Sequence, residues 1–523
     1  MKLQFLPPGA LRLHGPLGKA LDKVIANRLR QLDYGMLTAI FRDHSEKDDK
    51  WRCEFWGKVV RSAVYAWRGT GDAELKKIID KTVADILSTQ SDDGCISSYP
   101  AGKQLGGWDI WGRKYVLVAL TAYYKEMNQD PVILEKICAM ARQLLRKAGN
   151  LRDYGQHFGL AAASTLRVLV EIAELSGDEE ILAGAKLLAD SGCCQVHDIF
   201  EAARIGASPS EIGNGKSYEM TSCFQGLAAM YDLDNDPLKL EAVLNYYNLV
   251  HDEEIFITGG GGLKDGNGEF WYHGKERQIR PDCGGIGETC ITATWLWYSL
   301  KILTLTGDPQ IAERMERCLY NAMLGAVVPD GSNFLHINPY LTGGWKQPSG
   351  DQMADFPGHD CCRAQGPYGL AAAPVLAVMA TGNGYAVNLY EDLEVTGVLA
   401  VSGSYPSDGK VTVTLLKSGK FDIALRIPSE FACRIDGKTV PGGQYAVLNR
   451  NWQAGDKITL EFDLSLRQEK LAGMTAQLRG PLVLCREEGA DENACYLFKE
   501  NGLADYASAG MKLDPANTLV VWE

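Results

Sequence analysis

The sequence predicts a mainly α-helical chain with a β-rich end, namely an (α/α)6 barrel followed by a C-terminal antiparallel β-sandwich. Two observations predict this fold. Amphipathic helical stretches recur in pairs over the first two thirds of the chain, and a strict alternation of apolar and polar residues with turn signals begins near Gly382. We therefore place a helical domain at residues 1–381 and a β-sandwich at residues 382–523.

The helical stretches are separated by short breaks that end in aspartate, at Asp72, Asp130, Asp178, Asp236 and Asp308. Gly or Asn suits the end of one helix, and Asp or Pro suits the start of the next. Together with one N-terminal helix at about residues 17–41, these breaks predict six helical hairpins. An open superhelix of hairpins is the alternative, but long Gly-rich loops favour a closed barrel, because loops gathered at one rim build a pocket.

The β-rich region contains segments such as GKVTVTLL, FDIALRIP and DKITLEFDLSL, whose apolar residues alternate with polar ones. A short early segment, Leu11–Leu13, has the same character. We expect it to be a strand that pairs with the β-rich region, so that the first 15 or so residues belong partly to that region.

Composition excludes several classes of protein. The chain has 523 residues with 53 Lys+Arg and 66 Asp+Glu, so its formal charge is −13 and it lacks the basic surface that nucleic-acid binding requires. No apolar stretch approaches the ~20 residues of a membrane span. Pro7 and Pro8 interrupt the N-terminal segment, and no signal peptide is evident, which predicts a cytoplasmic protein. The 14 cysteines are spread along the chain and favour a reducing compartment over a disulfide framework.

One arrangement of cysteines is denser than the rest. Glu288 and Cys290 begin a predicted helix, and the adjacent pair Cys361 and Cys362 follows about seventy residues later. Three thiols and one carboxylate form a donor set that suits tetrahedral Zn²⁺, and a stabilised thiolate is a strong nucleophile. The alternative is inert, buried cysteine. A second adjacent pair at positions 193 and 194 shows that adjacency alone is weak support.

Two further groups of residues suggest chemistry. Glu269 lies in a Gly-rich loop beside aromatic residues, which disfavour the charged form of a carboxyl group, so it is a candidate general acid; a solvated loop glutamate is the alternative. The segment GGWDIWGRKY carries Trp108, Asp109, Trp111 and Arg113 at the edge of a predicted helix. Aromatic platforms combined with hydrogen-bonding groups are typical of sugar sites, although such residues also occur in cores.

The ordered motifs EFWGK, SSYP, WDIWGRKY, ITGG, ETC, NPY, CCRAQGP, LRIP, NWQAGD and LRGPLVL resemble those of glycoside hydrolase family 127, whose founding activity is β-L-arabinofuranosidase. The resemblance covers nearly the whole chain and implies the same barrel and β-sandwich architecture. It implies zinc ligands at Glu288, Cys290, Cys361 and Cys362, with Cys361 as nucleophile and Glu269 as acid/base. It also implies a retaining exo-hydrolase that acts on a glycoside or oligosaccharide of plant type.

The chain departs from the family pattern in the sugar pocket. Arg113 and a run of small residues near Gly159 stand where the family has histidines, and His336 replaces a pocket tyrosine. These departures spare the reacting groups, so the reaction class is better defined than the sugar. An arginine in the pocket would suit a carboxylated sugar, and we take Trp108, Asp109, Trp111, Arg113 and His336 as the candidate substrate-binding residues.

Two other functions fit the same sequence. A lyase or a carboxylate-only hydrolase can use the same barrel, because fold does not dictate chemistry. A glycan-binding protein with a purely structural zinc is the second alternative. The oligomeric state is open, and a homodimer is one expectation.

Overall fold

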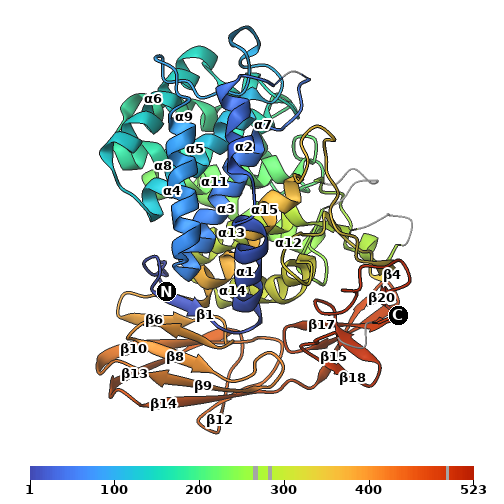
Figure 1. Cartoon of the computed structure of the whole chain (residues 1–523). Helices are drawn as coiled ribbons and strands as arrows, with labels where there is room; N and C mark the ends of the chain where they lie inside the picture. Colours follow the sequence, from blue (N-terminus) through green and yellow to red (C-terminus); the bar gives the residue numbers. More distant parts are fainter. Residues whose placement is uncertain (47, 263–268, 281–285, 491–493) are drawn as a thin grey trace.

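The computed structural model describes residues 1–46, 48–262, 269–280, 286–490 and 494–523. Figure 1 shows a helical part, coloured blue to yellow, standing above β-sheets coloured orange to red. One large apolar core runs through the helices and into the neighbouring sheets. A second, smaller core that includes Leu341, Leu478, Val483, Tyr506 and Trp522 lies in the last β unit. The molecule is therefore a helical N-terminal domain followed by mainly antiparallel β-sheets.

The described helices follow the chain in this order: α1 (Pro16–Val24), α2 (Tyr34–Arg42), α3 (Glu54–Thr70), α4 (Ala73–Leu87), α5 (Asp109–Glu126), α6 (Pro131–Ala148), α7 (Leu160–Ala163), α8 (Leu166–Ser176), α9 (Glu179–Asp190), α10 (Ile199–Arg204), α11 (Ser217–Asp234), α12 (Pro237–Glu253), α13 (Thr289–Thr306), α14 (Pro309–Cys318), α15 (Cys361–Leu370) and α16 (Ala372–Ala377). Short helical turns, including η1 (Ile25–Leu29) and η4 (Lys275–Ile279), connect some of them.

All five predicted aspartate breaks are helix starts. Asp72, Asp130, Asp178, Asp236 and Asp308 are the N-cap residues of α4, α6, α9, α12 and α14, and each side chain accepts a hydrogen bond from a backbone amide two or three residues later. A capping carboxylate satisfies an otherwise unpaired N–H and complements the positive end of the helix. The repeated break is therefore a capping signal.

The predicted N-terminal helix at residues 17–41 is divided in the structure. α1 continues into η1, the chain then turns, and α2 begins at Tyr34. Asp33 caps α2 by accepting a hydrogen bond from the Met36 amide at 3.0 Å. The same capping chemistry that marks the other breaks therefore ends this helix early, and the sequence prediction of one continuous helix was wrong here.

The helices near the middle of the domain pack side by side in sequence-distant pairs. α3 packs against α5 and α15, α13 packs against α11 and α15, and α8 packs against α5 and α11. Glycines permit the closest approaches: a Cβ on Gly57 of α3 would lie 2.2 Å from the backbone oxygen of Tyr115 in α5. This packing brings residues near position 54 and near position 361 together.

The described strands are β1 (Leu11–Leu13), β2 (Ile286–Glu288), β3 (Ile337–Asn338), β4 (Thr342–Trp345), β5 (Val378–Ala380), β6 (Gly384–Val387), β7 (Leu393–Val395), β8 (Leu399–Ser402), β9 (Lys410–Leu415), β10 (Gly419–Ile427), β11 (Cys433–Ile435), β12 (Lys438–Val440), β13 (Gln444–Trp452), β14 (Lys457–Phe462), β15 (Leu466–Leu471), β16 (Met474–Arg479), β17 (Leu482–Glu487), β18 (Lys499–Glu500), β19 (Leu503–Asp505) and β20 (Thr518–Val520).

These strands form more than the single antiparallel sandwich that the sequence predicted. One sheet has the order β1-β7-β8-β9-β14-β11-β12 and a second has the order β13-β10-β6-β5, in which β6 and β10 are parallel. Strands β15 to β20 form a separate sheet that also takes in β4 from the helical part of the chain. Figure 1 shows this last unit to the right of the other two sheets. The alternation of residues predicts strands but carries no information about how they divide into sheets.

The early strand ties the start of the chain to the β region. β1 pairs antiparallel with β7, so that Leu11 faces Val395 and Leu13 faces Leu393. The match with the strand expected at Leu11–Leu13 follows from its two inward leucines, which are both buried. β5, which precedes residue 382, pairs with β6. Strands thus cross the predicted boundary between residues 381 and 382.

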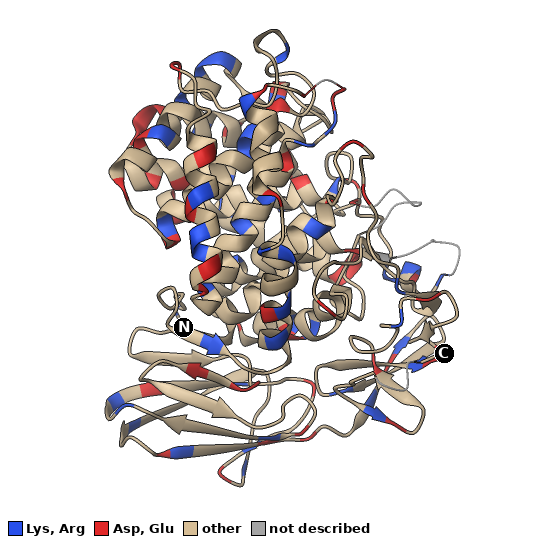
Figure 2. Cartoon of the chain, viewed as in Figure 1, with Lys and Arg blue, Asp and Glu red and all other residues tan. Residues whose placement is uncertain are grey.

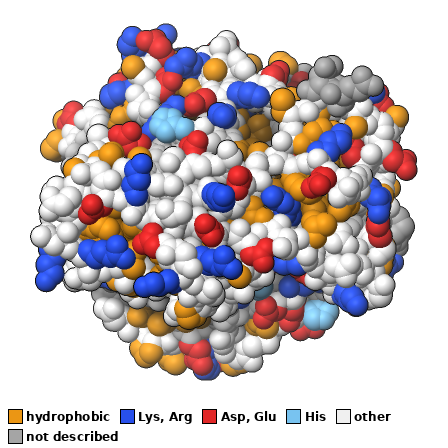
Figure 3. Space-filling view, turned by 90° about the horizontal axis from the view of Figure 1, so that it is seen from below, with side chains coloured by type: hydrophobic (Ala, Val, Ile, Leu, Met, Phe, Trp, Pro, Cys, Tyr) orange, Lys and Arg blue, Asp and Glu red, His pale blue; other side chains and the backbone are white. Residues whose placement is uncertain are grey.

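Charged side chains of both signs are interspersed over the helices and the sheets (Figure 2). On the face seen from below, the parts drawn in colour show apolar side chains in small patches between Lys, Arg, Asp and Glu (Figure 3). Such a mixture is typical of a surface without a dominant basic patch. In the part of the chain that the structure describes, no helix combines the length and hydrophobicity required to cross a bilayer.

Candidate active site

A cavity of about 340 Å³ lies where several helices begin. The described residues that line it are Trp51, Glu54, Trp108, Trp111, His157, Lys216, Glu219, Glu269, Glu288, His336, Gln352 and Cys361. Most of them precede or begin α3, α5, α11, α13 and α15. Because the N-terminal end of a helix carries a partial positive charge, this arrangement favours anionic groups in the cavity wall.

The dense cysteine arrangement predicted from the sequence is assembled at one side of this cavity. Ligand atoms of Glu288, Cys290, Cys361 and Cys362 all lie within 4.8 Å of one another. The sulfur of Cys362 is 3.5 Å from Oε1 of Glu288, and the sulfur of Cys361 is 3.9 Å from the same oxygen. All four residues are buried. The pairing of β2 with β3 holds Glu288 in place, and α15 begins with the cysteine pair.

The four side chains fit a divalent metal ion. Oε2 of Glu288 is buried and has no hydrogen-bond partner among the described residues. Burial, followed by the nearby Glu269, raises the pKa of Glu288 well above its usual range, and burial likewise raises the thiol pKa values of Cys290 and Cys362. Hydrogen bonds from these two thiols hold the pKa of Cys361 well below its usual range. Such crowding of acidic groups is relieved by a cation, and the S₃O donor set is one that Zn²⁺ accepts.

His336 and Asp360 complete the surroundings of the cysteine pair. Nδ1 of His336 lies 2.8 Å from Oδ2 of Asp360, and its Nε2 lies 3.7 Å from Oε1 of Glu288. Oδ1 of Asp360 accepts hydrogen bonds from the amides of Cys362 and Arg363 and so caps α15. Burial opposes protonation of His336, but the Asp360 carboxylate and Cys361 outweigh it and raise the pKa of His336 to about 12. His336, a predicted substrate-binding residue, therefore lines the cavity beside the candidate metal ligands.

Gln352 fixes Cys361 from the opposite side. Its Oε1 accepts hydrogen bonds from the Cys361 amide at 3.0 Å and from the indole nitrogen of Trp51 at 3.1 Å. Its Nε2 donates to the sulfur of Cys361 at 3.3 Å. A donor on a thiolate stabilises the charge. Gln352 thus connects the candidate nucleophile to an aromatic residue of the cavity wall.

Glu269 faces the same cavity as Cys361. Its carboxylate is ion-paired with Lys216, whose amine also lies 4.0 Å from Glu219. The backbone oxygen of Glu269 accepts a hydrogen bond from the Ser217 amide at 2.8 Å, which anchors the residue to the start of α11. The preceding residues 263–268 lie outside the described part of the chain, so only the C-terminal side of this loop is seen.

Glu219 and His157 form the wall next to Glu269. Glu219 is almost fully buried, and its Oε1 lies 3.9 Å from Nε2 of His157. Its Oε2 has no hydrogen-bond partner among the described residues. A buried acceptor without a partner costs free energy unless a ligand satisfies it. The Glu219 carboxylate is therefore available to accept hydrogen bonds from a ligand.

An aromatic wall closes the other side. The ring of Trp108 lies 5.9 Å from both Trp51 and Trp111 and 6.0 Å from His157, measured between centroids. The indole nitrogen of Trp111 donates to Glu54, whose other oxygen accepts from Lys58 at 2.8 Å. Burial, opposed by Lys58, raises the pKa of Glu54 to about 7. Trp108 and Trp111 thus take the cavity-lining positions predicted for them.

Asp109 and Arg113 do not belong to this wall. Neither is among the described residues that line the cavity, and both are almost fully buried inside the helical domain. Arg113 pairs with Asp109 one helical turn earlier at 2.8 Å and donates to Gln143 at 3.0 Å. The helical period explains the error: Trp108 and Trp111 share one face of α5, whereas Asp109 and Arg113 share another. The expectation that Arg113 would recognise a carboxylated sugar therefore loses its basis.

Several lining residues were not found from the sequence. Trp51, His157, Lys216, Glu219 and Gln352 are isolated polar or aromatic residues in or beside loops, far apart in the chain. Glu54 stood out only as the first residue of the motif EFWGK. The one signal that could have identified them is their position at the start of a helix. Lys216 and Glu219 lie at the start of α11, as Glu288 lies at the start of α13.

The helical domain contains a buried Glu-Cys₃ cluster, which opens into a cavity lined by aromatic and carboxylate side chains. Together these features indicate a glycoside hydrolase with a thiol at a candidate metal site. Residues 23–373 match the family described as Beta-L-arabinofuranosidase, GH127 catalytic domain, and residues 386–464 match the GH127 middle domain. The first match alone covers more than half of the chain. The protein belongs to glycoside hydrolase family 127, as its motifs indicated.

Known relatives agree with this assignment. A non-reducing end beta-L-arabinofuranosidase of Bifidobacterium longum subsp. longum is 23% identical over 503 residues, which covers 82% of this chain and 74% of the relative. The structure of a GH127 beta-L-arabinofuranosidase from Geobacillus stearothermophilus T6 has a TM-score of 0.71 at 19% identity and covers 100% of this chain and 99% of its own. A second GH127 beta-arabinofuranosidase has a TM-score of 0.77 at 18% identity, with 99% and 97% covered. These structural similarities concern the fold.

Proposed function

We propose that this chain is a retaining exo-glycosidase that hydrolyses β-L-arabinofuranosides or closely related glycosides. One observation carries the proposal: the sulfur of Cys361 lies among Glu288, Cys290 and Cys362 and borders the same cavity as Glu269. The site thus combines a nucleophile and a candidate acid/base residue within one sugar-sized space.

The proposed fold of the catalytic part is an (α/α)6 barrel. The packing of α3, α5, α8, α11, α13 and α15 against one another in a cycle supports a closed inner ring. The helix starts that line the cavity would then form one mouth of this barrel. We retain 1–381 and 382–523 as the proposed domains, with the proviso that β1 and β5 pair across them.

Glu288, Cys290, Cys361 and Cys362 are the residues that would hold zinc. A bound Zn²⁺ would supply positive charge that keeps the three sulfurs in their thiolate form. The hydrogen bonds to Cys361 from Gln352 and the capping of α15 by Asp360 orient the nucleophile from this chain's own residues.

Two steps complete the proposed reaction. In the first, the sulfur of Cys361 bonds to the anomeric carbon while the glycosidic C–O bond breaks and Glu269 gives its proton to the leaving oxygen. In the second, Glu269 takes a proton from water, whose oxygen bonds to the anomeric carbon as the C–S bond breaks. Two displacements at one carbon retain its configuration. Before the first step, the ion pair with Lys216 has to open and the Glu269 carboxylate has to take up a proton.

The sugar is proposed to be neutral. Glu219, Glu54 and Glu269 line the cavity with carboxylates, which accept hydrogen bonds from hydroxyl groups and repel a second carboxylate. The cations of the same lining, Lys216 and His336, are already paired with Glu269 and Asp360. Trp108 and Trp111 offer flat apolar surfaces to a sugar ring. With Arg113 outside the cavity lining, the pocket suits a neutral pentose better than a uronate.

The test is hydrolysis of a panel of 4-nitrophenyl glycosides that includes β-L-arabinofuranoside, α-L-arabinofuranoside and a β-glucuronide. We expect turnover of the β-L-arabinofuranoside. NMR spectra recorded before mutarotation should show that the β-anomer is released first. Preferred turnover of the glucuronide, or first release of the α-anomer, contradicts the proposal. For a Cys361→Ser variant, the matched control for the loss of a thiol is Cys495→Ser, because Cys495 is exposed whereas the cysteines of the cluster are buried.

A further inference from the structure

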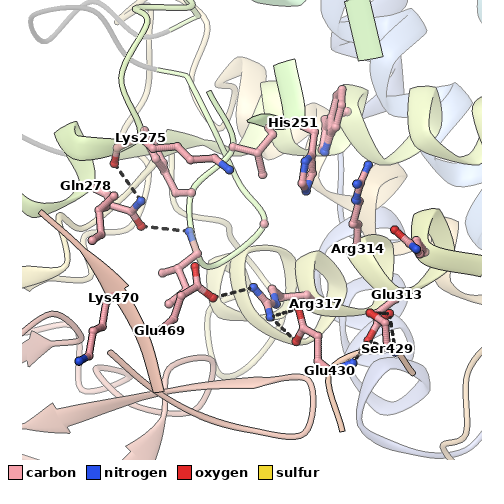
Figure 4. Close-up of a pocket in the computed structure, with 17 residues that line it drawn as sticks. His251, Lys275, Gln278, Glu313, Arg314, Arg317, Ser429, Glu430, Glu469 and Lys470 are labelled. Carbon is pink, nitrogen blue, oxygen red and sulfur yellow. Dashed lines mark hydrogen bonds and ion pairs between the residues drawn. The ribbon is translucent and has the colours of Figure 1, made fainter. Parts of the chain in front are cut away.

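A second cavity, also of about 340 Å³, lies where the helical domain meets both β units. Its walls come from α12, α13 and α14, from the segments at 255–259 and 275–278, from the turn at 429–430 and from β15. We call it the junction cavity. No described residue lines both this cavity and the candidate active site. Figure 4 shows its charged side chains, which reach it from elements far apart in the sequence.

The carboxylates of the junction cavity already have partners. Glu313 accepts hydrogen bonds from the amide and hydroxyl of Ser429 at 2.9 and 2.7 Å. Glu430 is ion-paired with Arg317 and with Arg467. Glu469 lies 3.3 Å from the guanidinium of Arg317. These contacts tie α14 to the β units and neutralise the charges of Glu430 and Glu469, whereas Glu313 is held by neutral donors.

Three cations of the same cavity lack such partners among the described residues: Lys275, Arg314 and the exposed Lys470. Among the described residues, neither Lys275 nor Arg314 has a carboxylate within ion-pair distance, although both are partly buried. Arg314 lies over the ring of Tyr247 at 5.8 Å. Figure 4 shows the Lys275 side chain reaching toward His251, with Arg314 beyond it. Lys275 and Arg314 therefore face one partly enclosed space without a carboxylate in ion-pair contact, and Asp252 and Glu469 act on Lys275 only from a greater distance.

The pKa values of His251 and Lys275 reflect the positive charge in this part of the cavity. Burial, reinforced by Arg314, lowers the pKa of His251 to about 4, so that this histidine is neutral near pH 7. Burial also lowers the pKa of Lys275; the nearby Arg314 and Arg317 add to this, and Asp252 and Glu469 oppose it. Bringing an anion into the cavity would relieve this repulsion.

We propose that the junction cavity binds a phosphate dianion, either free or as the monoester of a sugar, between Lys275 and Arg314. Two unpaired cations match a charge of −2 better than the single charge of a carboxylate. The planar guanidinium of arginine binds phosphate oxygens in pairs, and lysine adds a point charge. Ile257, Trp295 and Leu471 give the cavity an apolar side that a sugar carbon skeleton can contact.

Bound anion would stabilise the assembled chain, because its ligands belong to different elements. Lys275 lies six residues after Glu269, on the segment that also lines the candidate active site. Arg314 lies on α14, whose neighbours Glu313 and Arg317 hold the turn at Ser429–Glu430. A ligand that binds the folded chain alone raises the unfolding temperature as its concentration rises.

In the experiment, the full chain is titrated with inorganic phosphate, glucose 6-phosphate and glucuronate at constant ionic strength. Calorimetry measures binding, and thermal unfolding measures the change in stability. We expect saturable phosphate binding and a rise in unfolding temperature of about 3 °C at roughly 100 times the dissociation constant. Tighter binding of glucose 6-phosphate would identify the monoester as the ligand, and equal or tighter binding of inorganic phosphate would identify the free anion.

Variants locate the site. Arg314→Gln and Lys275→Gln should each weaken phosphate binding by about 10–100-fold, since each removes a charge-assisted hydrogen bond. Lys186→Gln removes one exposed cation on α9 and should leave affinity unchanged. The proposal is overturned if the wild type binds no phosphate, if both variants retain wild-type affinity, or if glucuronate binds as tightly as phosphate. These measurements use no glycoside, so their outcome is independent of the catalytic proposal.

Discussion

The chain contains two pairs of adjacent cysteines, and both have a third thiol nearby, Cys290 for one and Cys223 for the other. Among the described residues, only the pair at 361 and 362 shares a cluster of close donor atoms with a carboxylate. Cys361 and Cys362 begin α15, beside a carboxylate and a third thiol. Cys193 and Cys194 lie in the turn after α9, where the sulfur of Cys193 contacts the Leu188 carbonyl oxygen at 3.6 Å. Burial raises the pKa of Cys193 well above its usual range, whereas hydrogen bonds from neighbouring thiols lower that of Cys361. A cysteine pair acquires chemistry when a carboxylate and further thiols lie close enough to share one ion with it.

The largest expected difference between the pairs is in catalysis. Cys361→Ser should lower kcat at least about 1000-fold, because a serine hydroxyl is rarely ionised at neutral pH. Cys193→Ser should keep kcat within about twofold while it lowers the free energy of unfolding by about 1–3 kcal/mol, because a hydroxyl is more costly to bury than a thiol and is shorter than the sulfur that contacts Leu188. Steady-state kinetics on folded protein and denaturant titration measure both. Equal kinetic losses in the two variants would remove the distinction.

Metal content should separate the pairs next. We expect about one zinc ion per wild-type chain, and a loss of at least about 10–100-fold in zinc affinity for Cys290→Ser or Glu288→Gln. Cys223→Ser, which alters the neighbourhood of Cys193, should retain the metal. Elemental analysis after dialysis against a chelator measures this. A wild type without zinc, or full zinc in Cys290→Ser, contradicts the assignment of these ligands.

A smaller difference is expected in thiol reactivity. Iodoacetamide should modify Cys361 at least about tenfold faster than Cys193 in the folded protein, because Cys361 borders a cavity and has the lower thiol pKa. Peptide mass spectrometry after timed quenching gives both rates within one sample. Prior incubation with substrate should slow the reaction at Cys361 alone. Faster modification of Cys193 than of Cys361 would contradict the prediction that Cys361 is the more reactive thiol.

The smallest effects concern helix caps next to the two pairs. Asp360 caps α15, and Asp198 caps α10 just after the second pair. Replacement of either by alanine should lower the free energy of unfolding by about 0.5–2 kcal/mol. Only Asp360→Ala should also lower kcat, because Asp360 holds the amide of Cys362 and the ring of His336. Denaturant titration and kinetics on both variants test this, and equal kcat values would assign Asp360 a purely structural role.

Local chemistry made part of this structure predictable from the sequence. The five aspartate breaks were found because a capping carboxylate has a short-range signature, and the same signature at Asp33 was overlooked inside an apparently continuous helix. Strands were found by alternation, yet their division into sheets, with β6 and β10 parallel, depends on contacts between distant segments. The family resemblance is confirmed by the match to its catalytic domain.

The site was predictable only where residues are clustered in the chain. Glu288, Cys290 and the pair at 361 stood out by spacing, and the structure brings them together. Glu219 and Gln352 each stand alone in the sequence, and only the packing of segments far apart in the chain places them at one cavity. Arg113 was predicted to line the pocket because it is close in sequence to Trp108 and Trp111. It lies on another face of the same helix, where it pairs with Asp109 inside the domain.

The pairing of β1 with β7 has a consequence for the synthesis of this chain. Leu11–Leu13 is synthesised long before its partners at 393–395, because nearly the whole helical part lies between them in the chain. Until then the early strand has exposed backbone groups, and it must avoid other partners. A fragment that ends before β7 keeps that strand edge unpaired. The helical part should therefore be more prone to aggregation when it is expressed alone than when its β region follows.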